Sequence, residues 1–194
     1  MPKPKRHLYL ASASPRRAEI LTQFKIAFQV IQNGLETEPT LHAGKRLRND
    51  VKNLALLKAQ ASLNGHNGLI LGVDTVVTVG KIVLGKPRSV SEARQMLTKL
   101  SGSTHHVISG LCLYDTVDDR YFLRSELSDV TFRELSPNQI ERYCQNFEVL
   151  DKAGGYAIQD IGDPFVKTLK GSYFNVVGLP IHSLLRVLKN YDIV

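Results

Sequence analysis

Two serines, a proline and two arginines stand together in this sequence, where a strand pattern changes to a helix pattern. Residues 8–11 form a short apolar run typical of a buried strand, and helical spacing begins at Pro15. Ser14 suits the position before a helix, whose start presents free backbone N–H groups that bind anions. Arg16 and Arg17 therefore predict a site for a negatively charged ligand such as a phosphate chain. The alternative interpretation is a solvated, capped helix with two surface arginines.

Asp74 is the residue whose setting points most directly to catalysis. It follows the apolar run of residues 69–73 and precedes Val76 and Val77, so we expect its carboxylate to be buried. Burying a carboxylate is costly unless it is paired or used, for instance as a general base for water. The alternative is an Asp that caps a turn between two strands.

Two lysines could add positive charge to the same site. Lys86 stands in the short, stiffened turn Gly85-Lys86-Pro87. Lys58 lies near the apolar stripe of a predicted helix over residues 47–63. A lysine in that position usually extends its stem along the core, so core packing is its default interpretation unless another group recruits it.

Other reactive side chains predict less chemistry. His105 and His106 are adjacent and point to opposite faces of a strand, which argues against a shared metal site. Cys112 and Cys144 have neither metal-ligand spacing nor a disulfide framework, so a reducing cytoplasmic setting is expected. Neither cysteine has a nearby histidine, so we expect no covalent intermediate. The glycine pair at 154–155 could let the backbone approach a ligand or could serve only a tight turn.

The overall composition restricts the class of protein. The 194 residues are 43% hydrophobic and 22% charged, which is ordinary for a globular domain. No apolar run is long enough to cross a membrane, and the N-terminus lacks the apolar core of a signal peptide. The net charge of +7 suggests an acidic partner, but the basic residues are dispersed, which argues against a nucleic-acid surface.

Strand and helix patterns mix along the whole chain and predict a single α/β domain over residues 1–194. Residues 1–6 form a basic lead-in that we expect to be disordered. Strands are predicted at residues 8–11, 27–31, 69–73, 76–79, 82–84, 105–114, 121–132 and 172–177. Helices are predicted at residues 15–24, 47–63, 89–100, 136–146 and 181–190. The long middle strands are expected to run antiparallel.

Seven stretches, in this order, resemble the Maf family of nucleoside triphosphate pyrophosphatases: LYLASASPRRAEIL, LALLKAQA, LGVDTVV, GKP, LSGSTHHV, DKAGGYAIQ and GSYFNVVGLPI. The resemblance implies hydrolysis between the α- and β-phosphates of a nucleoside triphosphate, as a house-cleaning activity that yields the monophosphate and pyrophosphate. It also implies a mixed central sheet flanked by helices, with two lobes around a cleft, as in inosine triphosphate pyrophosphatase. A divalent metal cation, Mg²⁺ or Mn²⁺, and a homodimer are further expectations from the family.

The same resemblance implies roles for individual residues. Asp74 matches the family's proton acceptor, and Glu36 matches an acidic residue that we expect to bind the metal. Which carboxylate binds the metal and which acts as the base stays open. Ser12, Ser14 and Arg17 fall in the family's phosphate-binding loop, and Lys58 and Lys86 match the lysines of its cleft; we expect all five to bind substrate. Positions tied to nucleotide choice are Arg16, Thr75 and Gln159, and the last two match the branch that acts on dTTP and UTP.

The chain also departs from the family pattern. Asn53 and Leu57 stand where several members have Arg and Glu, and Asp160 replaces a common Gly. The added carboxylate beside Gln159 could alter the base preference or lie in solvent. Two alternative functions therefore stay open: a pyrophosphatase for another, modified nucleotide, and a non-catalytic protein that binds nucleic acid or regulates septum formation.

Overall fold

The computed structural model describes residues 6–191 and 193, without the side chains of residues 161–164. Its strands are β1 (Leu8–Ala11), β2 (Gln29–Ile31), β3 (Leu69–Val79), β4 (Ile82–Leu84), β5 (Thr104–Asp115), β6 (Arg120–Phe132) and β7 (Val166–Lys170). Its α-helices are α1 (Pro15–Gln23), α2 (Leu47–Gln60), α3 (Val90–Leu100), α4 (Pro137–Asn146), α5 (Ile158–Phe165), α6 (Tyr173–Val177) and α7 (Ile181–Leu188). Short 3₁₀ helices lie at η1 (Ala153–Gly155) and η2 (Lys189–Tyr191).

The strands of the described residues form one mixed, seven-stranded sheet, which confirms the predicted α/β class. Their order is β2-β1-β3-β5-β6-β7, and the short β4 pairs with β3. β1 runs parallel to both of its neighbours, β2 and β3. The pairs β3–β5, β5–β6 and β6–β7 are antiparallel, as predicted for the middle strands.

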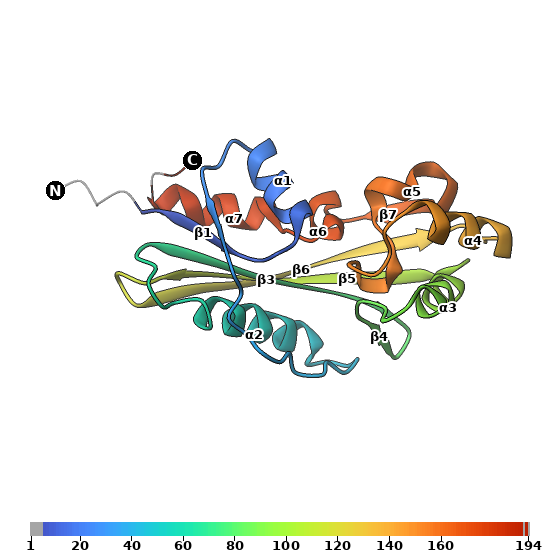
Figure 1. Cartoon of the computed structure of the whole chain (residues 1–194), viewed down its shortest axis with the longest axis horizontal. Coiled ribbons are helices and arrows are strands. Elements are labelled where there is room, and N and C mark those ends of the chain that lie inside the picture. Colours follow the sequence, from blue (N-terminus) through green and yellow to red (C-terminus); the bar gives the residue numbers. More distant parts are fainter. Residues whose placement is uncertain (1–5, 192, 194) are drawn as a thin grey trace.

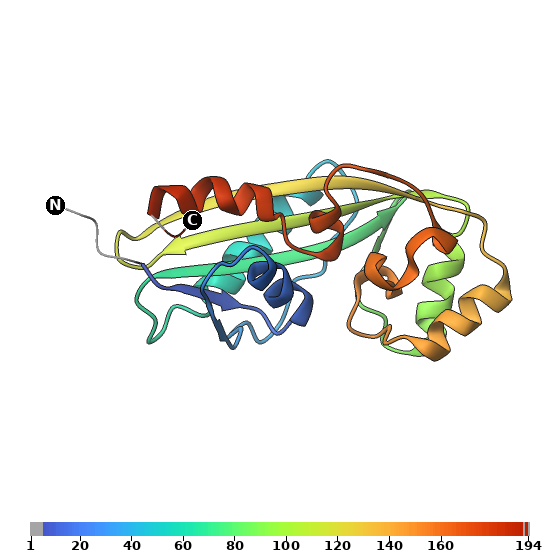
Figure 2. The ribbon, with the colours of Figure 1, turned by 90° about the horizontal axis from the view of Figure 1, so that it is seen from above.

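Helices cover both faces of the sheet and gather at one end of the long strands. α2 lies below the strands in Figure 1, and α1, α6 and α7 lie above them. Figure 2 shows α3, α4, α5 and η1 together at the right-hand end of the molecule, away from the end where the two termini lie. No helix of the described residues is long and apolar enough to cross a lipid bilayer. Helices thus flank the central sheet as predicted, and a division into two lobes stays a prediction.

α2 packs closely against the sheet because two glycines leave room for its backbone. A Cβ atom at Gly72 would lie 2.2 Å from the carbonyl oxygen of Ala55, and one at Gly110 would lie 2.3 Å from that of Val51. A side chain at either position would therefore push the helix away from the strands. The close approach matters for function because Lys58, on the same helix, reaches a carboxylate on β3.

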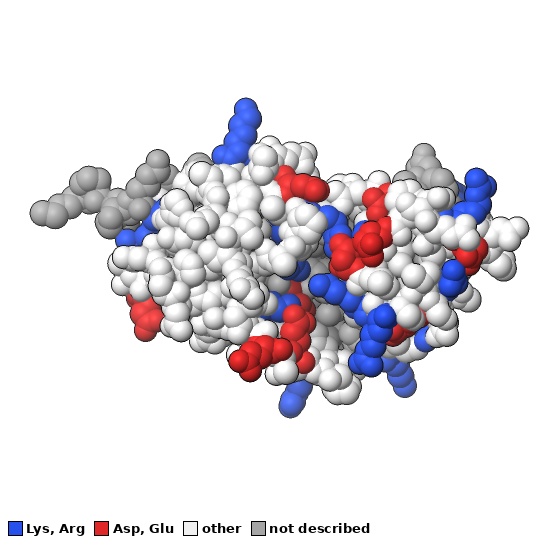
Figure 3. All heavy atoms as spheres, in the orientation of Figure 1, with Lys and Arg blue, Asp and Glu red and all other residues white. Residues whose placement is uncertain are grey.

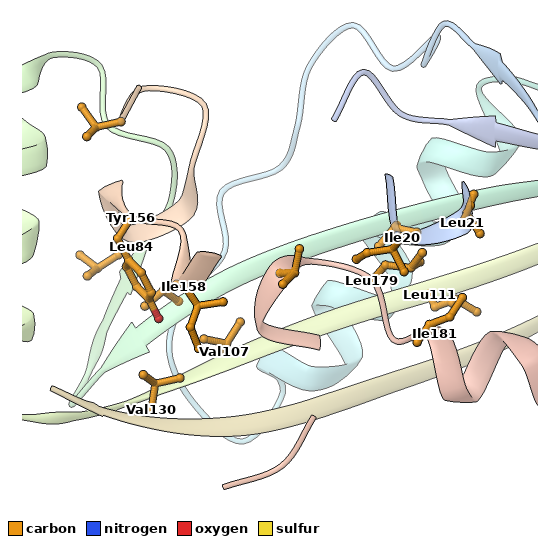
Figure 4. Close-up of a cluster of buried hydrophobic side chains, with 14 of the residues drawn as sticks. Ile20, Leu21, Leu84, Val107, Leu111, Val130, Tyr156, Ile158, Leu179 and Ile181 are labelled. Atoms are coloured by element: carbon orange, nitrogen blue, oxygen red, sulfur yellow. The ribbon is translucent and has the colours of Figure 1, made fainter. Parts of the chain in front are cut away.

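One large hydrophobic core extends along the sheet and holds segments that are distant in sequence (Figure 4). One group of its side chains contains Ile20, Leu21, Leu111, Leu179 and Ile181, and another contains Leu84, Val107, Val130, Tyr156 and Ile158. Full burial of a side chain of this size contributes roughly 1.5–3 kcal/mol. The core therefore fixes α1 on one side and the segment after η1 on the other.

The predicted end of the third strand at residue 73 is wrong. β3 continues to Val79, and Asp74 pairs with Gly110 of β5 inside the ladder. The strand can hold this charge because Lys58 forms an ion pair with the Asp74 side chain. Asp74 is thus part of a continuous strand, which excludes the alternative of an Asp that caps a turn.

The strand predicted at residues 172–177 is also wrong, because this segment contains α6. Ser172 caps the helix by accepting a hydrogen bond from the Asn175 N–H, and Gly178 ends it with a φ of 121°. A helix of five residues is too short to show helical periodicity in the sequence. α5 and β7 have no counterpart among the predicted elements.

The predicted lead-in falls mostly outside the described part of the chain, which omits residues 1–5. Arg6 is described, and its guanidinium lies 3.3 Å from carboxylate oxygens of both Asp115 and Asp118. The Asp115 side chain is fully buried, so this ion pair fixes Arg6 at the end of β5.

Candidate active site

A cavity of about 400 Å³ opens between the start of α1, the middle of β3 and the segment around η1. Among the predicted site residues, its lining includes Ser12, Ser14, Arg16, Arg17, Lys58, Thr75 and Lys86. Figure 3 shows positive and negative side chains gathered around a hollow in the middle of this face. A cavity of this volume accommodates a small organic molecule. The fold therefore brings together residues that are far apart in the sequence.

The start of α1 presents backbone N–H groups at this cavity. Ser14 occupies the position before the helix with extended backbone, and Pro15 follows as a helical residue. The Ser14 side chain makes no capping hydrogen bond, and the first turn contains no acidic residue. The positive end of the helix dipole is therefore available to an anion. This geometry favours an anion site over a capped helix on the surface.

Arg17 connects three parts of the cavity wall. Its guanidinium donates hydrogen bonds to Ser12 Oγ at 2.8 Å, the Gly178 carbonyl oxygen at 3.0 Å and Thr75 Oγ1 at 3.4 Å. Burial lowers the pKa of Arg17 to about 10, while the Asp74 carboxylate acts in the opposite direction. Arg17 is therefore positively charged at neutral pH, with its orientation fixed by the protein.

The Thr75 hydroxyl belongs to a hydrogen-bond network inside the protein. Its Oγ1 lies 2.9 Å from Ser109 Oγ and donates to the Gly178 carbonyl oxygen at 3.4 Å. Ser109 Oγ in turn donates to the Asn175 carbonyl oxygen at 3.1 Å. A ligand that contacts Thr75 must therefore add to these hydrogen bonds or replace one of them.

Lys58 lies between two carboxylates at the edge of the cavity. Its Nζ atom is 2.6 Å from Asp74 Oδ1 and 2.7 Å from Glu38 Oε1. The side chains of Lys58 and Asp74 are 8% and 9% exposed, so this pair is withdrawn from solvent. The other carboxylate oxygen, Asp74 Oδ2, is buried without a hydrogen-bond partner among the described residues. Such an oxygen is costly unless water, metal or substrate completes its interactions.

Arg16 and Lys152 share the carboxylate of Asp151 on the cavity wall. Arg16 Nη1 is 2.6 Å from Asp151 Oδ2, and Lys152 Nζ is 2.7 Å from Oδ1. All three residues line the cavity. Burial alone would raise the pKa of Asp151, but hydrogen bonds from Lys152 and Arg16 outweigh it and lower the pKa. The carboxylate is therefore ionised at neutral pH.

Three of the predicted site residues do not line the cavity. Asp74 reaches it through its contact with Lys58. Glu36, the predicted metal ligand, is exposed, whereas Glu38 lines the cavity. Gln159 is exposed in the first turn of α5. All the candidates for phosphate binding therefore line the cavity, whereas the candidates for the general base and the metal ligand, and one candidate for nucleobase recognition, do not.

Buried reactive groups near the sheet have structural settings. His105 Nε2 lies 2.6 Å from the hydroxyl of Tyr156, whose side chain lines the cavity. Burial, together with the adjacent His106, lowers the pKa of His105 to about 4, so its ring is neutral at pH 7. His106 is on the opposite face and 48% exposed, as predicted for adjacent strand residues. Burial raises the pKa of Cys112 to about 12, which makes its thiol unreactive.

Sequence reasoning missed Glu38, Asp151 and Lys152 as residues of the cavity. Glu38 stands close to Glu36 in the same polar connection, and no local pattern distinguishes the two. Asp151 and Lys152 begin the stretch DKAGGYAIQ, where adjacent opposite charges before a glycine pair were the available signal.

Comparisons with known proteins identify the family of the chain. The family model described as Maf-like protein matches residues 7–191. A protein from Clostridium perfringens named dTTP/UTP pyrophosphatase is 42% identical over 186 residues, which cover 95% of this chain and 96% of the relative. Proteins of the same name from Clostridioides difficile and Bacillus cereus are each 41% identical. The first match covers 95% of this chain and 95% of the relative, and the second covers 97% of this chain and 97% of the relative. The chain therefore belongs to the family of Maf-like proteins.

Proposed function

We propose that this protein hydrolyses dTTP and UTP to the nucleoside monophosphate and pyrophosphate, which removes these nucleotides from the cellular pool. The observation that carries the proposal is the buried oxygen Asp74 Oδ2, which lacks a partner among the described residues next to a cavity lined by cations. The relatives from C. perfringens, C. difficile and B. cereus carry the name of this activity.

Asp74 acts as the general base in this proposal. A water oxygen bonds to the α-phosphorus, the bond from that phosphorus to the α–β bridging oxygen breaks, and pyrophosphate leaves with the bonding electrons. Lys58 holds Asp74 through Oδ1 and leaves Oδ2 for the water proton. A positioned base of this kind contributes about 10²- to 10⁴-fold to the rate.

Cations that line the cavity bind the triphosphate. Arg16, Arg17, Lys86 and Lys152 line the cavity, and the start of α1 adds backbone N–H donors. Negative charge moves onto the pyrophosphate as the bond breaks, and donors that are already oriented stabilise that charge without reorganisation. Pyrophosphate is therefore a good leaving group in this site.

A divalent cation, Mg²⁺ or Mn²⁺, is part of the proposal. The described residues contain no group of three or more His, Cys, Asp or Glu side chains that could hold a metal alone. The Glu38 carboxylate, which lines the cavity, fits an ion that keeps several waters and takes phosphate oxygens as further ligands. Glu36, on the same connection as Glu38, stays a candidate ligand. When bound, the ion would neutralise phosphate charge and lower the pKa of water.

Lys86→Met is expected to raise the KM for dTTP about tenfold, on the scale of one lost charge-assisted hydrogen bond. Tm should change little, because Lys86 is exposed and has no ion-pair partner among the described residues. Steady-state kinetics and thermal unfolding measure the two effects. Lys81→Met is the matched control, since Lys81 is exposed in the β3–β4 turn and does not line the cavity. An unchanged KM, or a large loss of stability, would contradict the assignment of Lys86.

The base preference is expected to place dTTP and UTP above CTP and GTP in kcat/KM by about tenfold to a hundredfold. A mismatched base leaves buried polar groups without hydrogen-bond partners, which costs about 1–3 kcal/mol and corresponds to this ratio. A glutamine amide offers an acceptor and a donor side by side, which suits the imide N–H between two carbonyls of uracil or thymine. Gln159 is the candidate for this contact.

Pyrophosphate release from a panel of common and modified nucleotides, with Mg²⁺ present, tests the proposal. The ranking of bases is expected to change in Gln159→Glu and to stay unchanged in Gln60→Glu, which alters an exposed residue of α2 outside the cavity. A wild-type preference for GTP or a modified nucleotide would contradict the assignment to dTTP and UTP. No release from any nucleotide, with salt-sensitive binding to DNA, would favour the nucleic-acid-binding alternative.

A further inference from the structure

Arg16, Asp151 and Lys152 form a charge cluster, and the catalytic proposal leaves the carboxylate of this cluster unexplained. Asp151 directs one carboxylate oxygen to each cation, with Oδ2 2.6 Å from Arg16 Nη1 and Oδ1 2.7 Å from Lys152 Nζ. All three side chains line the cavity. A carboxylate inside a site for a polyanion opposes binding through like-charge repulsion, so its position there requires a physical reason.

Both cations have a second anchor that does not depend on the Asp151 carboxylate. Arg16 Nη2 donates to the carbonyl oxygen of Asp151 at 3.1 Å, and Lys152 Nζ donates to the carbonyl oxygen of Glu148. These backbone acceptors can hold the cations in place when the carboxylate moves. The Lys152 ammonium carries three N–H donors, and the Glu148 carbonyl takes only one of them, so two are left for other acceptors.

Asp151 is also the most exposed member of the cluster. Its side chain is 40% exposed, compared with 18% for Arg16 and 8% for Lys152. The carboxylate can therefore rotate toward solvent while the two cations stay enclosed. Although burial opposes it, the hydrogen bonds from Lys152 and Arg16 lower the pKa of Asp151, so the group that leaves is an anion.

We infer that Arg16 and Lys152 form a subsite for a phosphoryl group, and that Asp151 occupies this subsite until a polyphosphate displaces its carboxylate. Phosphoryl and carboxylate oxygens accept the same charge-assisted hydrogen bonds from these cations. A polyphosphate carries several negative charges and gains more from the exchange than a singly charged anion does. That the natural ligand is a nucleoside triphosphate rests on the proposed function.

Inorganic pyrophosphate is the probe, because it tests the subsite without turnover. Isothermal titration calorimetry at fixed ionic strength gives its affinity for each variant. Asp151→Asn is expected to bind pyrophosphate about fivefold to tenfold more tightly than wild type, the scale of one like-charge contact in a partly wet site. Lys152→Gln is expected to bind it about tenfold more weakly, because a charge-assisted donor is lost.

Glu141→Gln is the matched control for the loss of one carboxylate. Glu141 pairs with Arg94 at 2.6 Å and is 41% exposed, which resembles Asp151, but it lies outside the lining of the cavity. Its affinity for pyrophosphate should equal that of wild type. Thermal unfolding establishes that each variant is folded, and Lys152→Gln tests the subsite by itself if Asp151→Asn does not fold.

Equal or weaker pyrophosphate binding by folded Asp151→Asn would overturn the role of Asp151 as a competitor. Unchanged binding by Lys152→Gln would overturn the subsite. Both outcomes are distinct from failure of the proposed function, which would show as a wild-type protein that releases no pyrophosphate from nucleotides. The binding of added pyrophosphate by the variants tests the subsite whether or not the wild-type protein hydrolyses nucleotides.

Discussion

Asp74→Asn is expected to lower kcat for dTTP about 10²- to 10⁴-fold, the contribution of a positioned general base. The fold should be retained, because an amide oxygen can still accept the hydrogen bond that Lys58 donates to Oδ1 at 2.6 Å. KM should change little, since Asp74 does not itself line the cavity. Steady-state pyrophosphate release and thermal unfolding separate these effects.

Asp129→Asn makes the same chemical change away from the cavity. Asp129 lies on β6, where its carboxylate is 2.7 Å from His106 Nδ1. This variant should keep the wild-type kcat. If folded Asp74→Asn also kept a rate within a few-fold of wild type, Asp74 would have no place in the mechanism.

Lys58→Met is expected to reduce the free energy of unfolding by about 3–5 kcal/mol, the usual cost of removing one partner from a buried ion pair. The substitution leaves the Asp74 carboxylate buried without its cation, and it also removes the partner of Glu38. Urea-induced unfolding measures the loss. Adding Asp74→Asn to Lys58→Met should recover most of the stability, because no buried charge then lacks a partner, but it should not restore activity.

Arg94→Met is the control for breaking an ion pair at the surface. The Arg94 and Glu141 side chains are 38% and 41% exposed, and exposed pairs contribute only about 0–1 kcal/mol. Lys58→Met should therefore cost several times more than Arg94→Met. Equal costs would mean that Lys58 mainly extends its stem along the core, as its default sequence interpretation proposed.

Local signals in the sequence predicted most of the helices and strands. The helix predicted at residues 136–146 is confirmed, and it begins at a capping box: the Ser136 hydroxyl accepts from the Gln139 N–H while the Gln139 side chain accepts from the Ser136 N–H. The errors have causes that no local pattern contains. β3 continues through Asp74 because a lysine on another element pairs with the carboxylate. The segment at 172–177 is helical because Ser172 caps a turn too short to show periodicity.

The candidate site divides in the same way. The loop before α1 could be recognised as a candidate anion site because its serine, proline and arginines are contiguous in sequence. The contact of Arg16 with Asp151 joins residues separated by 135 positions, so only the folded chain shows it. Likewise, only the tertiary structure shows that Glu38, and not Glu36, lines the cavity and contacts Lys58.

The position of bond cleavage tests the central claim most directly. Wild-type protein is incubated with dTTP and Mg²⁺ in water enriched in heavy oxygen, and the products are identified by phosphorus NMR and mass spectrometry. Attack of water at the α-phosphorus predicts dTMP and pyrophosphate in equal amounts, with the heavy oxygen in dTMP. Formation of dTDP and orthophosphate, heavy oxygen in pyrophosphate, or no hydrolysis would contradict the account.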